Sequence, residues 1–177
     1  LAGVPHIWRT IHGFYFTRDT SLALNTFFVN MERAVNRVHE VVFSQNSEDI
    51  ATADARGIRR AEDIILLGNG IDVTRFDPDA VDVEATNALR QKYGIEPGDI
   101  VAGFVGRLVI QKGMRELLAA FEKIADAHPR LKLLLVGAAD HGKADGVAPE
   151  QHLPAPLLAR VIQTGWQTEV HRFLPLM

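Results

Sequence analysis

Cysteine is absent from this sequence of 177 residues. That absence excludes disulfide bridges and thiolate metal ligands, and it fits a reducing cytosol. No apolar run approaches the roughly 20 residues that a membrane-spanning helix needs. A basic stripe or polybasic tail is also missing, and the formal net charge is −3, so a nucleic-acid partner is not expected.

Two common phosphate-binding motifs are missing as well. No Gly-Lys-Ser/Thr closes a Walker loop, and no Gly-x-Gly-x-x-Gly marks a dinucleotide site. What the sequence does contain is an alternation of short apolar runs, often ended by glycine, with amphipathic segments. This alternation predicts an α/β fold of parallel strands covered by helices, and the length suits one domain or two small ones.

The stretch 100–113, IVAGFVGRLVIQKG, carries the clearest pattern. Residues 100–105 form a short, β-branched apolar run bounded by glycine, which predicts a buried strand. Apolar residues at helical spacing begin after Gly113, and a second apolar run at 131–136 ends at Gly137. The pattern therefore predicts a strand, a loop, a helix and a second parallel strand.

Arg107 and Lys112 lie in the loop between that strand and that helix. In doubly wound sheets, ligands bind beyond the carboxyl ends of the strands, and a helix N-terminus attracts anions. A guanidinium grips a phosphate through two hydrogen bonds while an ammonium adds a point charge, so a diphosphate is the natural ligand. The alternative is a pair of solvated surface cations.

His12 also follows an expected strand, which ends near Ile11. Gly13 lets the backbone turn sharply there, and an imidazole is easily tuned near neutral pH. The residues alone nevertheless favour a histidine packed beneath the aromatic run 14–16, and a packed loop rather than a stacking platform for that run.

The first 70 residues contain further expected strands at 40–43 and 63–67 and a helix from Ser47 to Gly57. Ser21 can cap an earlier helix, in which Glu32, Arg33 and Arg37 are expected to face solvent. The expected inward stripe of that helix is Leu24, Phe27, Phe28, Met31, Val35 and Val38.

Residues 71–79 are polar and broken by proline, which predicts a crossing between two domains. Beyond the crossing, 83–93 is expected to be helical, and short helices at 157–163 and 169–177 are expected to flank a turn at Gly165. The irregular stretch 138–156 is expected to be a solvated loop without a metal. Its candidate ligands match no ligand spacing; they are Asp140, His141, Asp145 and His152.

Several stretches together carry a family resemblance in their order and spacing. They are His12-Gly13-Phe14, the strand end at Ser44, Asn69-Gly70-Ile71-Asp72 with Arg75-Phe76, the segment 103–113 with Leu117, Ala120, Phe121, Pro129 and Leu134 to Gly137, and Thr164-Gly165-Trp166. These stretches resemble the retaining family 4 glycosyltransferases along nearly the whole chain. The run from Val105 to Gly137 is the most specific part.

The resemblance implies a GT-B architecture with two Rossmann-like halves, both incomplete here. Residues 1–78 would be the later part of the N-terminal acceptor domain plus the crossing, and 79–177 the first part of the C-terminal donor domain. The implied activity is retaining, metal-independent transfer of a hexose from a nucleotide-diphosphate sugar to a saccharide or lipid-linked glycan, without a cofactor. Such an enzyme would serve bacterial polysaccharide biosynthesis in the cytoplasm or at the inner face of the membrane.

The resemblance also implies roles for particular residues. Arg107 and Lys112 would hold the donor diphosphate and neutralise charge on the leaving group, and Gly106 would let the backbone come close. Gly165 and Trp166 would lie near the nucleobase. His12 would lie near the transferred sugar.

The sequence departs from the family pattern in three places. A pair of glutamates separated by seven residues would follow Met177, and a glycine-rich loop would stand near the start of the first domain; both are absent, and Ala138 and Ala139 replace a glycine-rich turn. We therefore expect a fragment of a longer enzyme, inactive or weak by itself. The alternatives are a GT-B sugar-nucleotide epimerase, which needs more acids and histidines around the sugar, and a non-catalytic nucleotide-sugar-binding module.

Overall fold

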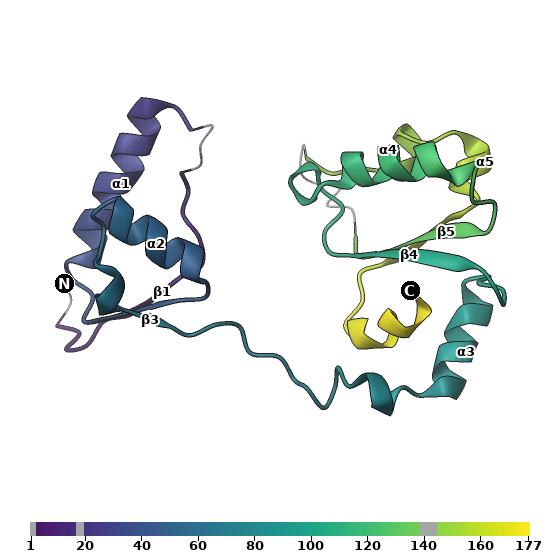
Figure 1. The fold of residues 1–177 in the computed structure, drawn as a ribbon, viewed down its shortest axis with the longest axis horizontal. Coiled ribbons are helices and arrows are strands. Elements are labelled where there is room, and N and C mark those ends of the chain that lie inside the picture. Colours follow the sequence, from purple (N-terminus) through teal and green to yellow (C-terminus); the bar gives the residue numbers. More distant parts are fainter. Residues whose placement is uncertain (1–2, 17–19, 139–144) are drawn as a thin grey trace. The chain divides into compact units, whose positions relative to one another are not determined.

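The computed structural model describes residues 3–16, 20–138 and 145–177, and the chain divides into two compact units, Leu1–Ile71 and Asp72–Met177 (Figure 1). Each unit is built on a three-stranded parallel sheet. The expected α/β class with two Rossmann-like halves is therefore confirmed. Because the division falls after Ile71, the segment from Asp72 to Pro78 packs with the second unit rather than the first.

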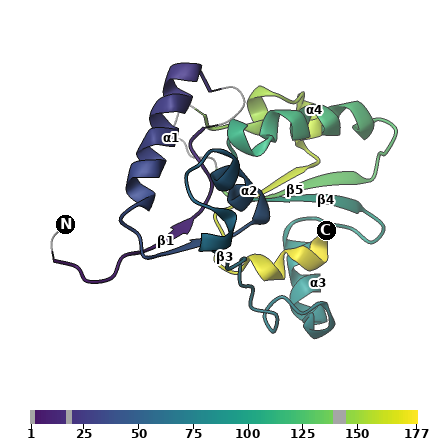
Figure 2. The ribbon, with the colours of Figure 1, turned by 60° about the vertical axis from the view of Figure 1, so that its left-hand side comes forward.

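The first unit alternates strands and helices in chain order. Its elements are β1 (Trp8–Ile11), α1 (Leu22–Asn36), β2 (Val41–Ser44), α2 (Ser47–Ala55) and β3 (Ile64–Leu66). The strand order is β1-β2-β3, and both helices lie on one face of the sheet (Figure 2). The core between them is made by Ile11, Phe16, Val29, Val42, Ala53, Ile58 and Ile64.

The expected inward face of α1 is wrong except at Phe28, which packs against the core. Phe27 is 61% exposed and Leu24 53% exposed, whereas the buried residues of the helix are Val29, Glu32 and Asn36. A buried ion pair between Glu32 and Arg9 of β1 explains this orientation: Nη1 of Arg9 lies 2.6 Å from Oε2 of Glu32, and Nη2 donates to Oε1 at 2.9 Å. Ser21 occupies the N-cap position, but its side chain makes no capping hydrogen bond.

The ion pair can be tested by removing one partner. Glu32→Ala should lower the free energy of unfolding of the first unit by about 3 kcal/mol, because it leaves the largely buried guanidinium of Arg9 without its counter-charge. The double variant Arg9→Met with Glu32→Leu should recover most of that loss. Urea unfolding followed by Trp8 fluorescence, in a Trp166→Phe background, separates the two units. A single variant as stable as the parent would contradict the buried pair.

The second unit begins with a helix and then forms its own sheet. Its elements are α3 (Val83–Lys92), β4 (Ile100–Val105), α4 (Met114–Ala125), β5 (Leu131–Val136), α5 (Ala155–Leu158) and β6 (Val161–Gly165). The strand order is β4-β5-β6. Helices α4 and α5 cover one face of this sheet, while α3 and the C-terminal turns cover the other (Figure 1). Leu133 and Leu135 point to the α4 side and Leu134 and Val136 to the α3 side, as expected of a strand buried on both faces.

The helices expected at 157–163 and 169–177 are wrong in part. Only Ala155–Leu158 is helical in the first region, and Val161–Gly165 pairs with β5 as a strand. Arg160 fixes this turn into the strand, because its guanidinium donates to the carbonyl oxygens of Ala125 and Leu131, both at 2.9 Å. Single 3₁₀ turns, at Val170–Arg172 and Leu174–Leu176, replace the second helix, since Pro175 has no backbone N–H for a longer one.

Charged side chains at the amino ends of β4 and β5 are paired with each other. Lys132 Nζ lies 2.8 Å from Oδ2 of Asp99, and the same oxygen accepts from the backbone N–H of Glu96 at 2.7 Å. The hydrogen bonds from Lys132 and from the Glu96 backbone hold the pKa of Asp99 below its ordinary value.

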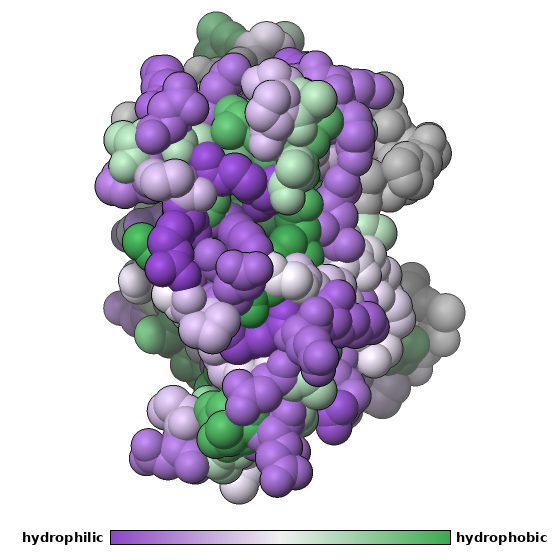
Figure 3. Space-filling model, turned by 90° about the vertical axis from the view of Figure 1, so that its right-hand side faces the viewer, coloured by the Kyte–Doolittle hydropathy of each residue, from purple (hydrophilic) through white to green (hydrophobic). Residues whose placement is uncertain are grey.

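The side of the molecule drawn in Figure 3 carries hydrophilic side chains over most of its surface, with separate apolar patches.

The depressed pKa of Asp99 predicts an acid-sensitive contribution to stability. Because the folded pKa lies below the unfolded value near 3.8, the carboxylate stabilises the fold fully above about pH 4, and the contribution is lost as the pH falls further. Asp99→Asn should therefore lower the free energy of unfolding by about 1 to 2 kcal/mol at pH 7. Thermal melts at pH 7 and pH 3 measure this. The assignment fails if the variant and the parent differ equally at both pH values.

Candidate functional site

The carboxyl edge of the second sheet ends in three glycines. Gly106, Gly137 and Gly165 directly follow or close β4, β5 and β6, with φ values of 150°, 152° and 69°. Gly137 and Gly165 form an isolated bridge, so the ends of β5 and β6 stay paired past the register shift at Leu135 and Val136. This edge is where ligands bind in doubly wound folds, and the missing side chains leave the backbone open to close approach.

The loop 106–113, here called the cation loop, leaves this edge and enters α4. Backbone N–H groups of Gly106 and Leu108 donate to the carbonyl oxygens of Val136 and Ala138 at 3.0 and 3.1 Å, which continues the β4–β5 ladder past the strands. On its other side, Ile110 N donates to Asp145 O at 2.9 Å. The loop is thus pinned from both sides, and it is anchored to the core by Leu108 and Val109, 1% and 0% exposed.

The two cations of this loop point to solvent. Both Arg107 and Lys112 are exposed, and neither side chain has a hydrogen bond or an ion pair within the described part of the chain. Lys112 ends a 3₁₀ turn, Ile110–Lys112, directly before Gly113 and the first turn of α4. Lys112 therefore stands at the N-terminus of α4, where the partial charge of the helix is also positive.

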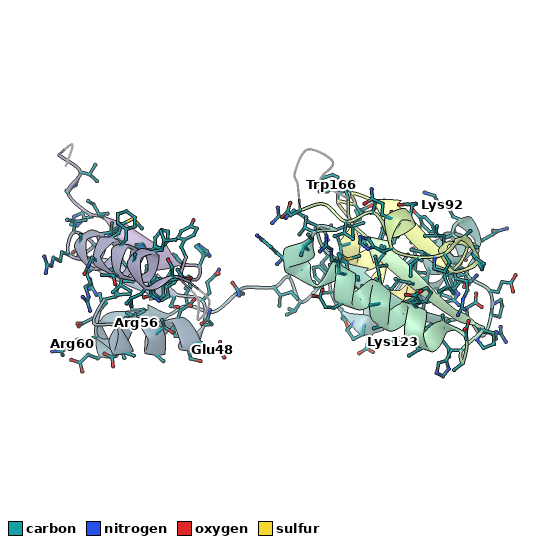
Figure 4. All side chains as sticks on the ribbon, turned by 90° about the horizontal axis from the view of Figure 1, so that it is seen from above. Glu48, Arg56, Arg60, Lys92, Lys123 and Trp166 are labelled. Atoms are coloured by element: carbon teal, nitrogen blue, oxygen red, sulfur yellow. The ribbon has the colours of Figure 1, made fainter. Side chains whose placement is uncertain are left out.

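The turn at Gly165 is fixed by its neighbours rather than by burial. Thr164 Oγ1 donates to the carbonyl oxygen of Gly165 at 3.0 Å, and Gln167 Nε2 donates to the carbonyl oxygen of Thr164 at 2.8 Å. Trp166 is 73% exposed, and Figure 4 labels it in the second unit. An exposed indole held by a rigid turn can stack on a planar ligand.

The crossing segment is attached to the residues that follow this turn. Oδ1 of Asp72 accepts hydrogen bonds from Thr74 Oγ1 at 2.8 Å and from the backbone N–H of Arg75 at 3.1 Å, and these bonds lower the pKa of Asp72. Arg75 Nε donates to His171 Nδ1 at 3.0 Å, and its Nη2 donates to the carbonyl oxygen of Thr168 at 3.3 Å. The sequence reveals no pairing of residues so far apart, so this link was missed.

The attachment through Arg75 predicts a local effect. Arg75→Ala removes both bonds to the segment 168–171, so we expect backbone amides of Arg172 and Phe173 to exchange several-fold faster with deuterium. The melting temperature should change little, because the contacts are exposed. NMR-detected hydrogen exchange measures both, and Lys92→Ala, another exposed cation of the same unit, is the control. Unchanged exchange in Arg75→Ala would contradict the attachment.

His12 lies directly beyond β1, and it is exposed rather than packed beneath the aromatic run, so that interpretation is wrong. Its Nδ1 lies 2.7 Å from Oε1 of Gln45, which follows the neighbouring strand β2. Because an amide oxygen only accepts, Nδ1 carries the proton of this bond, and in the neutral ring Nε2 keeps its lone pair. Gln45 was not predicted as a site residue.

The aromatic run beside His12 is a packed loop, as expected. The rings of Phe14 and Phe16 stack with their centroids 4.9 Å apart, and Arg56 lies over Phe16 at 5.6 Å. Arg56 comes from the end of α2, where Figure 4 labels it. Tyr15 is 79% exposed, and its ring stacks on Phe28 of α1 with the centroids 6.1 Å apart.

No group of three His, Asp or Glu side chains that could hold a metal ion occurs among residues 3–16, 20–138 and 145–177. Two of the candidate ligands considered above, Asp140 and His141, lie outside the described residues.

A pocket of about 380 Å³ lies elsewhere in the second unit, between the crossing segment, α3 and the C-terminal turns, and it is lined largely by apolar side chains including Phe76, Leu89 and Leu174.

The chain belongs to the family Glycosyl transferases group 1, whose family model matches residues 85–174. That match contains the cation loop and the Gly165 turn. The fold is similar to a crystal structure of HepE from Anabaena in complex with UDP, with a TM-score of 0.74 and 24% identity over 95% of this chain and 44% of that one. A glycosyltransferase from Rickettsia africae gives a TM-score of 0.65 at 16% identity, covering 94% and 42% of the two chains. The GT-B expectation for the fold is thereby confirmed.

Among curated proteins, the chain is similar to a D-inositol 3-phosphate glycosyltransferase of Segniliparus rotundus, with 36% identity over 84% of this chain and 32% of the relative. It is also similar to a 2-deoxystreptamine glucosyltransferase of Streptomyces kanamyceticus, with 31% identity over 52% of this chain and 30% of the relative. The chain therefore spans about a third of the length of these relatives. Within the described residues, no helix is both long and apolar enough to cross a membrane.

Proposed function

We propose that this chain is part of a glycosyltransferase that moves a hexose from a nucleotide-diphosphate sugar to a saccharide or lipid-linked glycan, with the donor bound mainly by its second unit. The observation that carries the proposal is the cation loop: two unpaired cations at the carboxyl edge of a parallel sheet whose strands end in glycines. The proposal is supported by the family, and by the UDP and the UDP with glucose bound in the two HepE structures of similar fold.

The chemistry of the proposed step is the departure of a nucleoside diphosphate. As the bond between the sugar and the diphosphate breaks, negative charge builds up on the phosphate oxygens. Arg107 would bind these oxygens through a fork of N–H donors, and Lys112 would add a mobile positive charge. Both side chains would stabilise the transition state more than the ground state, which is the requirement for catalysis. They would thereby neutralise the charge that a metal ion neutralises in other transferases.

The remaining assignments follow from the same proposal. Trp166 and Gly165 would contact the nucleobase, and His12 would position the transferred sugar through its free Nε2. The proposed transfer retains the anomeric configuration, as in family 4, and needs no metal. The enzyme would work in the cytoplasm, and association with the inner face of the membrane would bring it to lipid-linked acceptors.

The diphosphate assignment is tested by calorimetric titration with UDP and GDP, alongside uridine and guanosine, with and without magnesium. Each charged hydrogen bond to a phosphate contributes roughly 1.5 to 3 kcal/mol, so Arg107→Ala and Lys112→Ala should each weaken diphosphate binding by about 10- to 100-fold. Binding of the nucleosides should stay unchanged, because they carry no phosphate for these cations.

Lys123→Ala is the matched control, since Lys123 is an exposed cation near the far end of the same helix, α4 (Figure 4). This variant should bind the diphosphate like the parent. Equal losses for nucleoside and diphosphate, or an equal loss in Lys123→Ala, would overturn the role of the cation loop. Binding only in the presence of magnesium would overturn the metal-independent form of the proposal.

A further inference from the structure

We infer that Gly137 is a positioning residue for Arg107: its lack of a side chain is what allows the cation loop to hold the guanidinium at the edge of the sheet. The inference rests on the proposed function for its consequence in binding, but not for its structural step. It concerns a residue that touches neither a phosphate nor a sugar in the proposal.

The first step is steric. A Cβ built on Gly137 would overlap the carbonyl oxygen of Gly106 and would lie 2.9 Å from its carbonyl carbon, closer than real Cβ atoms come to other atoms. Both are backbone atoms, so no side-chain rotation can relieve the overlap. The φ of Gly137, 152°, is also one that other residues rarely adopt. Any side chain at this position must therefore move the backbone at Gly106.

The second step identifies the residues that take up this displacement of the backbone. Hydrogen bonds from Gly106 N to Val136 O and from Leu108 N to Ala138 O lie on either side of Gly137 in the ladder. Leu108 and Val109 are buried, and Val147 N donates to Leu108 O at 2.9 Å, so the loop is held firmly from Leu108 onward. A displacement imposed at Gly106 is thus absorbed between Gly106 and Leu108, which is where Arg107 stands.

The third step separates the two cations. Lys112 follows the buried anchor and belongs to a 3₁₀ turn of its own, so its position does not depend on Gly106. The position of Arg107, in contrast, depends both on the buried residues that follow it and on Gly106, which precedes it. A bidentate grip on phosphate tolerates misplacement poorly, because both N–H donors must stay aligned. Gly137→Ala should therefore resemble Arg107→Ala and should leave the contribution of Lys112 intact.

The structural step is tested by NMR-detected hydrogen exchange on the protein without ligand. In Gly137→Ala, we expect the amides of Gly106 and Leu108 to exchange at least 10-fold faster, with amides of α4 and of β4 before Val105 unchanged. Gly94→Ala is the control, because Gly94 has a positive φ of 63° in the same unit but nothing within 4 Å of an added Cβ. Unchanged exchange in the loop, or a uniform increase across the unit, would overturn the positioning role.

The functional step is tested by titration with UDP and GDP in a double-mutant cycle. Gly137→Ala should weaken diphosphate binding about 10-fold or more, while adding the same change to Arg107→Ala should weaken it little further. Adding Gly137→Ala to Lys112→Ala should weaken diphosphate binding by the same factor as Gly137→Ala does in the parent. Independent losses with Arg107→Ala would overturn the inference. If the parent binds neither diphosphate, the proposed function fails for this chain, and hydrogen exchange still decides the role of Gly137.

Discussion

The cation loop depends on one constraint, the continuation of the β4–β5 ladder beyond the ends of both strands. Ordinary parallel pairing stops where side chains crowd the turn, but Gly106 and Gly137 let two backbones stay in contact for three more residues. The hydrogen bonds of Gly106 and Leu108 then fix the direction in which the loop leaves the sheet. Because Leu108 and Val109 are buried, the same loop also sets where α4 begins.

The charges of the second unit are distributed unevenly between the two ends of its sheet. At the amino ends, Lys132 is paired with Asp99, whose carboxylate also accepts a backbone bond. At the carboxyl ends, Arg107 and Lys112 have no counter-charge among the described residues. Surface charges of a stable fold are free to be paired or unpaired at little cost. The two unpaired cations at the carboxyl end of the sheet are the basis of the proposed diphosphate site.

Local patterns predicted the elements whose signals lie within a few residues. The strands at Ile100–Val105 and Leu131–Val136 and the helix Met114–Ala125 follow from uninterrupted apolar runs, glycine ends and a helical stripe. The position of Arg107 and Lys112 beyond a strand followed from the same signals. The site geometry around them did not, because the approach of Gly137 to Gly106 joins residues about thirty positions apart, a distance that no local pattern records.

The wrong predictions also concern features that depend on contacts between residues far apart in the sequence. The apolar stripe of α1 was assigned to the core, but the buried pair of Glu32 with Arg9 turns the helix, and an ion pair across two elements leaves no periodic signal. A helix was expected over 157–163 and a turn at Gly165, whereas Val161–Gly165 forms a strand. Its pairing with β5 and the guanidinium of Arg160 decide its conformation.

The crossing segment adds a constraint that bears on the nucleobase assignment. Asp72 and Arg75, which the sequence pattern placed in the crossing between the domains, belong to the second unit. Arg75 holds the carbonyl oxygen of Thr168 and the ring of His171, two and five residues beyond the exposed indole of Trp166. The turn that carries Trp166 is therefore braced by the segment through which the chain enters the unit. The crossing segment is therefore hydrogen-bonded to the residues that directly follow the turn of Trp166, a contact between parts of the chain more than ninety residues apart.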